Sequence, residues 1–354
     1  MAIKLTSGGG MLNRTQKQIF RALMAKPSTF WQLIREQDGH LAHFTQVMEE
    51  MLARGLARYE GSHIYLTDKG KKLAQDQGIS PLEPLACPTC DGKTVTLQGR
   101  FSRVLEEFKE IARQRPPAIA EFDQGYVDTM STVARVAIMY QRGDLENQDI
   151  LLIGDDDLTS IAIALTGMAR HITVLEVDDR LVEFIDLQAR KKGWTNLSVH
   201  RYDVRHPLPR EFQGQYDTFL IDPVETLPGI RLFLSRCALS LRGKGSAGYF
   251  GLTHLEASRD KWYFIQRLIL EMNFVITDII HNFQEYELER EGFVSKNYPL
   301  VQRAFGPLPV PDTNWYTSNF FRLEAVGKPR VPEQENIPTG REFYFDDEAY
   351  ATLP

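Results

Sequence analysis

The stretch LLIGDDDLTSIAIAL, residues 151–165, has the pattern of a buried strand, a tight turn and the start of a helix. Nucleotide-binding α/β folds usually place glycines in this turn, where they allow a phosphate to approach the backbone. Here Gly154 is followed by three carboxylates, Asp155, Asp156 and Asp157. Three acids would repel a phosphate or a carboxylate, so the turn predicts a positively charged ligand.

This stretch belongs to an alternation of helices and strands that begins near residue 100. Strands are predicted at 149–153, 171–177, 197–200, 216–221 and 245–251, and helices at 100–114, 127–142, 158–169, 179–192, 229–242 and 256–272. The strands are short and apolar, as in a parallel sheet that is covered on both faces. Two later runs, FVITDIIHNFQEYELE and YTSNFFRLEAV, predict an antiparallel edge. The order predicts an α/β, class I methyltransferase-like Rossmann fold over residues 99–327.

Residues 1–80 predict a separate winged-helix domain of three helices, a β-hairpin wing and a further helix. The segments RTQKQIFRALMAKPSTFWQLI and HFTQVMEEMLARGLARYE carry apolar residues at helical spacing. A DNA-recognition helix should carry several basic residues. The predicted one has almost none and contains Glu49 and Glu50. A docking or dimerisation role is therefore favoured over DNA binding, and we expect a homodimer.

The overall composition limits the class of protein. A chain of 354 residues predicts two domains with appendages rather than one core. The net charge of −6 argues against general nucleic-acid coating and favours cationic partners. No apolar run reaches the length of a membrane span, and MAIKLTSGGG lacks a signal-peptide core. Three cysteines are not a disulfide framework, so we expect a cytoplasmic protein.

Residues 81–98 predict a linker that contains Cys87 and Cys90 in a Cys-x-x-Cys arrangement. A closed zinc site needs four ligands. The remaining cysteine, Cys237, lies far away in a predicted helix, so a metal would need His63 or a second subunit. A redox-inert pair is therefore favoured, Cys87 and Cys90 are weak metal candidates, and we expect no metal.

Acidic residues follow four of the predicted parallel strands where each strand ends. They are Asp155, Asp156 and Asp157 after the first strand, Glu176 and Asp178 at the second, Asp203 after the third, and Asp222 and Glu225 after the fourth. In doubly wound sheets the ligand lies beyond these ends. A helix cap needs one carboxylate, not three, so the acids predict a binding site.

These acids suit an adenosine derivative that has no negatively charged arm. Glu176 can accept hydrogen bonds from both ribose hydroxyls, and Asp203 can accept one from the adenine amino group. S-adenosylmethionine carries a carboxylate, which the turn would repel, whereas decarboxylated S-adenosylmethionine carries a sulfonium and an ammonium. One such pair at ~4 Å and an effective dielectric of ~20 contributes about 4 kcal/mol before desolvation. We expect this donor as a co-substrate, with no tightly bound cofactor, at Gly154, Asp155, Asp156, Glu176, Asp178 and Asp203.

The reaction that such a donor implies is displacement at the carbon next to sulfur by a neutral amine. A nearby carboxylate is needed to accept the proton of the amine or to position it. Asp157 and Asp222 are the candidates, and which of them is the base stays open. Asp157 is expected in a solvent-reached turn, so that its substitution would leave the fold intact.

The motifs IGDDDLTS, VLEVDDRL and YDTFLIDPVETLPG, with the upstream FDQGYVDT and the predicted winged helix, resemble those of the branched-chain polyamine synthases. These are the N(4)-bis(aminopropyl)spermidine synthases of thermophilic archaea and bacteria. The resemblance covers nearly the whole chain. It implies two aminopropyl transfers from decarboxylated S-adenosylmethionine to the secondary amine of spermidine, which give N(4)-aminopropylspermidine and then N(4)-bis(aminopropyl)spermidine, with release of 5′-methylthioadenosine.

The same resemblance implies roles for single residues. The third aspartate of the turn, Asp157, is implied to be essential near the attacking nitrogen. Linear spermidine synthases are similar at Glu176, Asp178 and Asp222 but lack the triple-aspartate turn. The residues expected to bind the acceptor are Tyr126, Asp157, Asp222, Pro223 and Glu225.

Two other functions remain open at this point. The sequence DPVE is loosely similar to the Asp-Pro-Pro-Tyr motif of S-adenosylmethionine-dependent nucleic-acid amino-methyltransferases, and a winged helix could deliver such a substrate. The acidic site argues against a phosphate backbone. A transcriptional regulator that senses a nucleotide is the third interpretation, and it would not need a carboxylate after the fourth strand.

Residues 328–354 predict a flexible acidic and aromatic tail that ends in REFYFDDEAYATLP. It is either a solvated terminus, a segment docked on a partner subunit, or a lid. As a lid, its aromatic side chains would cover the aliphatic parts of a polyamine and its acids would meet the terminal ammonium groups.

Overall fold

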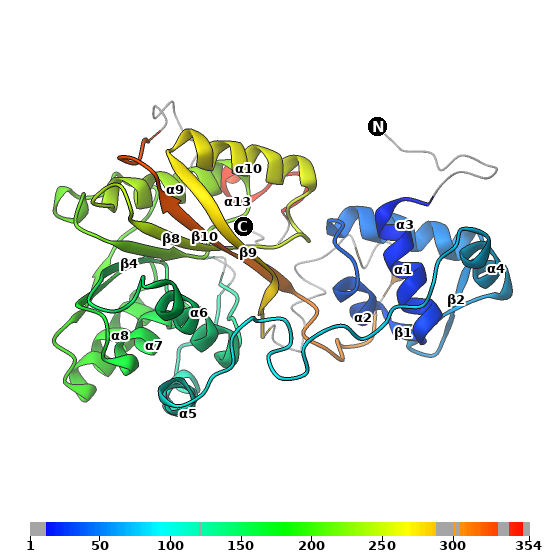
Figure 1. The fold of residues 1–354 in the computed structure, drawn as a ribbon, viewed down its shortest axis with the longest axis horizontal. Coiled ribbons are helices and arrows are strands. Elements are labelled where there is room, and N and C mark those ends of the chain that lie inside the picture. Colours follow the sequence, from blue (N-terminus) through cyan, green and yellow to red (C-terminus); the bar gives the residue numbers. More distant parts are fainter. Residues whose placement is uncertain are drawn as a thin grey trace. The chain divides into compact units, whose positions relative to one another are not determined.

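The computed structural model describes residues 12–119, 122, 124–287, 301, 305–306, 308–331 and 340–349. The chain forms two compact units (Figure 1). The first contains Met1–Leu85 and Glu289–Trp315, and the second contains Ala86–Leu288 and Tyr316–Pro354. The first unit thus includes a segment that the sequence assigned to the catalytic domain.

The first unit is a small helical domain with a three-stranded sheet. Its elements are α1 (Arg14–Ala25), β1 (Ser28–Thr29), α2 (Phe30–Arg35), α3 (Leu41–Ala53), β2 (Ala57–Glu60), β3 (His63–Leu66) and α4 (Asp68–Asp76). The strands are antiparallel in the order β1-β3-β2. This is the predicted order of helices and hairpin, and membership of the winged-helix class stays a prediction.

Local sequence explains where the helices of this unit begin, whereas long-range contacts explain why residues 308–315 pack on it. Asn13 and Thr29 each form a capping box with the glutamine three residues later. The indole Nε1 of Trp31 donates to the Pro309 carbonyl at 2.9 Å. The Thr29 hydroxyl donates to Asp312 at 2.8 Å. These contacts are long-range, so no local pattern predicts them.

The second unit contains a seven-stranded sheet in the order β6-β5-β4-β7-β8-β10-β9. The strands are β4 (Asp149–Ile153), β5 (His171–Glu176), β6 (Leu197–Arg201), β7 (Thr218–Ile221), β8 (Ala247–Leu252), β9 (Phe274–Glu285) and β10 (Thr317–Ala325). The five strands β4 to β8 are parallel, and β10 runs antiparallel to both neighbours. The predicted α/β Rossmann-like fold and its antiparallel edge are confirmed.

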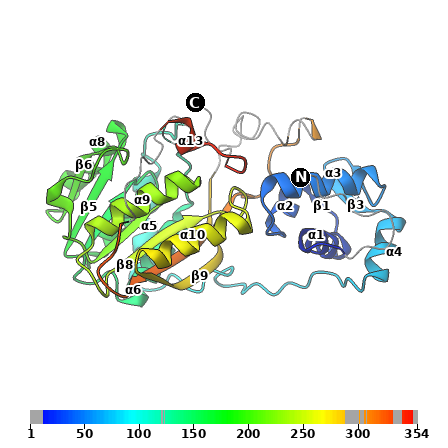
Figure 2. The ribbon, with the colours of Figure 1, turned by 90° about the horizontal axis from the view of Figure 1, so that it is seen from above.

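Helices cover both faces of this sheet, as Figures 1 and 2 show. They are α5 (Arg100–Ala112), α6 (Thr129–Arg142), α7 (Thr159–Thr166), α8 (Asp179–Lys192), α9 (Leu227–Ser240) and α10 (Arg259–Glu271). One core packs α5 to α8 against one face, and a second packs α9 and α10 against the other. Burial on both faces explains why the parallel strands are continuously apolar.

Helix α6 starts two residues later than its apolar pattern predicts. Val127 is bridged to Tyr286 next to the end of β9, and Asp128 caps the helix through the N–H of Ser131. The residues before the helix are therefore tied to β9, which brings β9 to the carboxyl end of β4.

Among the described residues, no helix is both long and apolar enough to cross a membrane.

Candidate active site

The three aspartates of the turn between β4 and α7 have different hydrogen-bond partners. Gly154 has a φ of 77°, which favours glycine, and Leu158 at the start of the helix also has a positive φ of 56°. The Asp155 carboxylate accepts from the N–H of Ser160 at 3.2 Å and from its hydroxyl. Asp155 is therefore the helix-capping acid, and it is buried. Burial raises the pKa of its carboxyl well above the usual value.

Asp156 faces the cavity beyond the ends of the strands. Its carboxylate accepts from the N–H of Gly125 at 3.1 Å. Burial, together with the charges of Asp157, Asp222 and Glu176, raises the pKa of this carboxyl well above its usual value. A cation that entered the cavity would relieve this repulsion.

Asp157 is buried, and the expectation of a solvent-reached position is wrong. Its side chain is 4% exposed, because the backbone before α6 closes over it. One carboxylate oxygen accepts from the N–H of Val127 at 2.6 Å, and the other accepts from Arg135 at 2.5 Å. Substitution of Asp157 therefore affects a buried ion pair as well as the turn.

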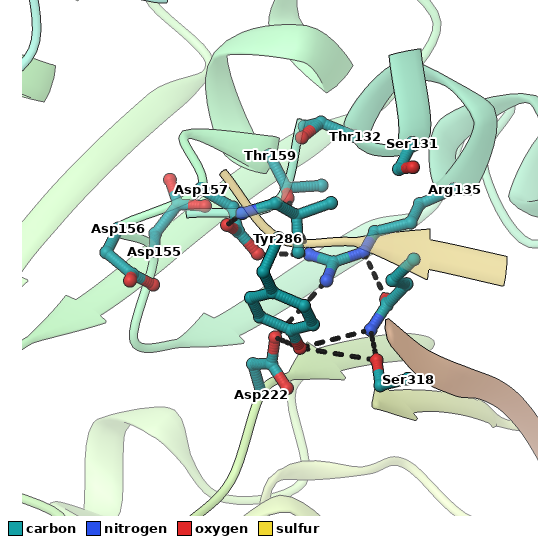
Figure 3. A network of polar contacts seen from close by, with 12 residues as sticks. Ser131, Thr132, Arg135, Asp155, Asp156, Asp157, Thr159, Asp222, Tyr286 and Ser318 are labelled. Atoms are coloured by element: carbon teal, nitrogen blue, oxygen red, sulfur yellow. Dashed lines mark hydrogen bonds and ion pairs between the residues drawn. The ribbon is translucent and has the colours of Figure 1, made fainter. Parts of the chain in front are cut away.

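Arg135 connects the acids of two strands, as Figure 3 shows. It lies on α6 with its side chain 2% exposed, and its guanidinium contacts Asp157 at 2.5 Å and Asp222 at 3.2 Å. Its Nε donates to the side chain of Gln284 on β9. Burial alone would lower the pKa of Arg135, but the Asp157 and Asp222 carboxylates outweigh it and raise the pKa.

Arg135 is not among the site residues that the sequence predicts, although its place in an apolar helix indicates a buried charge. The helix around it is buried on nearly all sides, and Val133, Ala134 and Val136 flank the arginine. A buried arginine needs a carboxylate partner. An arginine inside an apolar helical run is thus a reason to search the strand ends for its partners.

Asp222 follows β7 and contacts the cavity, with its side chain 24% exposed. The Tyr286 hydroxyl donates to the same carboxylate oxygen as Arg135, at 2.7 Å. Burial raises the pKa of Asp222 to about 6, a direction that Asp157 supports and Arg135 opposes. Figure 3 shows Tyr286 and Ser318 beside it, and neither was predicted.

The cavity has a volume of about 590 Å³. It is lined by Phe122, Gln124, Ile153, Gly154, Asp156, Leu175, Glu176, Val177, Tyr202, Asp203, Val204, Arg205, Asp222, Val224, Phe233, Phe343, Tyr344 and Phe345. A cavity with apolar and aromatic walls and four acids, Asp156, Glu176, Asp203 and Asp222, suits a flat ring that carries a cationic arm.

Glu176 and Asp203, which the sequence predicts to bind the donor, both line this cavity, and their role stays a prediction. Glu176 accepts from the N–H groups of Asp155, Val177 and Asp178 at 2.7–2.9 Å. Burial nevertheless raises the pKa of its carboxyl. Asp203 pairs with Arg205 at 2.6 Å. Burial alone would raise the pKa of Asp203, but the hydrogen bonds that Arg205 donates outweigh it and lower this pKa.

Six predicted site residues do not line the cavity. They are Asp155 and Asp157, which are described above, and Asp178, Tyr126, Pro223 and Glu225. Asp178 caps α8 and accepts from Gln124 at 2.9 Å, so it orients a residue that does line the cavity. The Tyr126 hydroxyl donates to the Pro116 carbonyl, and its ring packs under Arg115.

Glu225 lies just beyond Asp222 in the chain. One of its carboxylate oxygens accepts from the N–H of Thr253 at 2.7 Å. The other is buried and has no hydrogen-bond partner among the described residues. Burial, followed by the charge of Glu256, raises the pKa of Glu225 well above its usual value. Glu225 is thus an acid that a cation would stabilise.

Within the described ranges, no group of three or more His, Cys, Asp or Glu side chains is arranged to hold a metal ion. Cys87 and Cys90 are free thiols there.

Comparison with known proteins gives consistent matches over most of the chain. The family model "Branched-chain polyamine synthase A C-terminal domain" matches residues 103–351. The N(4)-bis(aminopropyl)spermidine synthase of Thermococcus kodakarensis is 41% identical over 343 residues, covering 96% of this chain and 95% of that one. The enzyme of the same name from Methanocaldococcus jannaschii is 38% identical and covers 91% of each.

A solved structure matches both units of the chain. It is the C9 mutein of the branched-chain polyamine synthase from Thermus thermophilus, in complex with N4-aminopropylspermidine and 5′-methylthioadenosine. The TM-score is 0.84 at 35% identity, with 96% of this chain and 93% of that chain covered.

Arg135→Met is expected to destabilise the protein by about 3–5 kcal/mol, because it leaves two buried carboxylates without their cation. Chemical denaturation at neutral pH measures the loss, and the deficit should shrink as the pH falls below about 6 and the Asp222 carboxylate becomes protonated.

Arg142→Met is the matched control on the same helix. Arg142 pairs with Asp278 but is 46% exposed, so its loss should cost at most about 1 kcal/mol. Equal losses for the two variants would contradict the buried ion-pair network.

Proposed function

The chain belongs to the branched-chain polyamine synthase family, as its motifs predict, and we propose that its acidic cavity is an aminopropyltransferase site. The donor is decarboxylated S-adenosylmethionine, and the acceptor nitrogen is the secondary amine of spermidine. Successive transfers give N(4)-aminopropylspermidine and N(4)-bis(aminopropyl)spermidine, with 5′-methylthioadenosine as the other product. The relatives' names support aminopropyl transfer over methyl transfer to a nucleic acid.

One observation carries the proposal most directly. Three carboxylates that line one cavity, those of Asp156, Glu176 and Asp222, all have raised pKa values. Burial is the largest cause for all three, and the charges of neighbouring carboxylates add to it. Positive charge in the cavity would relieve this cost. This positive charge can come from a sulfonium, an ammonium or a polyamine. A phosphate or a carboxylate would instead add negative charge.

The donor side of the cavity fits the adenosine part of the donor. Glu176 at the end of β5 is the group for the ribose hydroxyls, and Asp203 after β6 is the group for the adenine amino nitrogen. Ile153, Leu175 and Val224 provide apolar contact for the ring. Asp156 then lies on the side of the sulfonium and the aminopropyl ammonium.

The transfer step is a displacement at carbon. The lone pair of the spermidine secondary amine forms the new C–N bond while the C–S bond breaks, and its electrons leave the sulfur neutral in 5′-methylthioadenosine. The product nitrogen loses one proton to become a tertiary amine. In the second transfer this tertiary amine attacks and becomes quaternary, so no proton remains to be lost.

Asp222 is the carboxylate suited to hold or accept that proton. It lines the cavity, and its pKa of about 6 makes it largely ionised at neutral pH while still able to take up a proton. Asp157 is joined to Asp222 through Arg135 and fixes where the Asp222 carboxylate lies. The resemblance implies that Asp157 also lies near the attacking nitrogen, and we include this role in the proposal.

The tail contributes the aromatic wall of the cavity in this proposal. Within 340–349, the short helix α13 (Arg341–Tyr344) packs Phe343 against Phe233, and the Phe343 carbonyl accepts from the Thr226 hydroxyl at 2.6 Å. Asp346 pairs with Lys261 at 2.7 Å. These contacts to its own chain support a lid docked in the closed position. The proposed hinge between Pro329 and Pro338 lies partly outside the described residues, and Tyr350 lies outside them.

We further propose a cytoplasmic homodimer whose partner is the small polyamine substrate and not nucleic acid. The net charge of −6 supports cationic partners. The first unit, with few basic residues in α3, supports a docking role.

The experiment that tests this function is incubation with spermidine and either sulfonium donor, followed by mass spectrometry. Decarboxylated S-adenosylmethionine should give 5′-methylthioadenosine and mass increases of one and two aminopropyl groups. Formation of S-adenosylhomocysteine with S-adenosylmethionine, and no aminopropyl product, would reject the proposal in favour of methyl transfer.

Asp222→Asn should lower turnover by about 10²–10⁴-fold at neutral pH, because the group that takes the proton is lost. In the wild-type protein, kcat/KM should fall as the pH decreases through about 6, since the Asp222 carboxylate becomes protonated.

The variant should lack this acidic limb, and its deficit should diminish at high pH, where the amine loses its proton without help. A deficit of the same size at every pH would instead assign Asp222 to positioning of the acceptor ammonium.

A further inference from the structure

Two of the three cysteines lie at the surface of the second unit, before α5. Cys87 is exposed and Cys90 is partly exposed, whereas Cys237 is buried in α9. The transfer reaction uses neither Cys87 nor Cys90. The sequence favours a redox-inert pair, but the geometry of its turn indicates a reactive one.

The pair lies in a tight hydrogen-bonded turn. The N–H of Asp91 donates to the Cys87 carbonyl at 2.8 Å, and the N–H of Lys93 donates to the Cys90 carbonyl at 2.8 Å. Asp91 and Gly92 have φ values of 45° and 81°, so the chain folds back directly after Cys90. The reduced turn is thus already closed, and the Cys90 side chain lies within hydrogen-bonding reach of the Cys87 thiol, as a disulfide between the two requires.

Cys87 is the thiol prepared for attack. The backbone N–H groups of Thr89 and Cys90, and then the side chain of Cys90, form hydrogen bonds that hold the pKa of the Cys87 thiol below its usual value. The thiolate is the nucleophilic form of cysteine. In contrast, burial raises the pKa of the Cys237 thiol well above its usual value.

Lys93 fixes this turn to the sheet. It is buried, and its Nζ donates to the Phe283 carbonyl at 2.8 Å and lies 3.6 Å from the Glu285 carboxylate. Both partners belong to β9, on either side of Gln284, which contacts Arg135. The anchor limits how far the turn can open and so keeps the two thiols close.

Thiol–disulfide exchange suits this pair better than metal binding. A closed zinc site needs four ligands. Two thiols are present here, and the described part of the chain adds no third His, Cys, Asp or Glu in a suitable position.

We propose that Cys87 and Cys90 form a redox site that exchanges with small-molecule disulfides. The Cys87 thiolate attacks one sulfur of a disulfide RSSR, which forms a mixed disulfide and releases RS⁻. Cys90 loses its proton to solvent, and its sulfur attacks that of Cys87. The internal disulfide forms and a second RS⁻ leaves, so two protein thiols are oxidised and one RSSR is reduced to two thiols.

The test uses the full chain with oxidised glutathione as the probe, followed by acid quenching, alkylation and peptide mass spectrometry. The wild-type protein should form the Cys87–Cys90 disulfide without accumulating a glutathione adduct. Cys90→Ser should stop at an adduct on Cys87. Cys87→Ser should react at least ~10-fold more slowly than Cys90→Ser, because the stabilised thiolate is gone.

Cys237 is the internal control for folding and should stay unmodified in all three proteins. Accumulation of an adduct on the wild-type protein would overturn the proposal, and so would absence of any reaction at Cys87. Equal rates for the two serine variants would overturn the assignment of Cys87 as the attacking thiol.

Lys93→Met tests the anchor, with Lys69→Met in the first unit as the matched control. Lys69 also donates to a backbone carbonyl, that of Arg54, but at an exposed position. Without the anchor, the equilibrium constant for the internal disulfide against glutathione should fall ~5-fold, because the effective concentration of the two thiols decreases. An unchanged constant would overturn the positioning role of Lys93.

Discussion

The buried guanidinium of Arg135 between Asp157 and Asp222 is the interaction on which the site depends. A charged group in the protein interior is tolerated only when it is paired and hydrogen-bonded. Arg135 meets this condition with Asp157, Asp222 and Gln284, and so joins β4, β7 and β9 at one point. Without this cation the acids at the strand ends would repel one another with no compensation. With it, Asp157 is held in place and Asp222 still reaches the cavity.

The pairing of Arg135 with Asp157 also determines which carboxylates are left to attract a ligand in the cavity. Of the three aspartates in the turn, Asp155 binds the start of α7 and Asp157 binds Arg135, so Asp156 is the one that lines the cavity. Together with Glu176 and Asp222 it makes the carboxylates of the cavity outweigh its cation, Arg205. A donor with an ammonium is attracted there, and a donor with an added carboxylate is repelled. The donor preference that we propose therefore depends on one aspartate of the turn, whereas the sequence suggests all three.

The sequence predicts the strands, their order and the acids at their ends, because periodicity and strand-end position are local properties. It does not predict that Asp157 is buried, since Val127 and Arg135, which cover it, lie more than twenty residues earlier in the chain. Tyr286 and Gln284 could not be found either, because they reach the site through the pairing of β9 with β10. Nor does any local signal show that residues 308–315 pack in the first unit.

The most direct test is calorimetric titration of the protein with decarboxylated S-adenosylmethionine and with S-adenosylmethionine, repeated with Asp156→Asn. We expect at least ~10-fold tighter binding of the decarboxylated donor, since one uncompensated charge contact at ~4 Å contributes more than about 1.4 kcal/mol. The gap should shrink in the variant. Equal affinities of the wild-type protein for the two donors would contradict the electrostatic basis of the site.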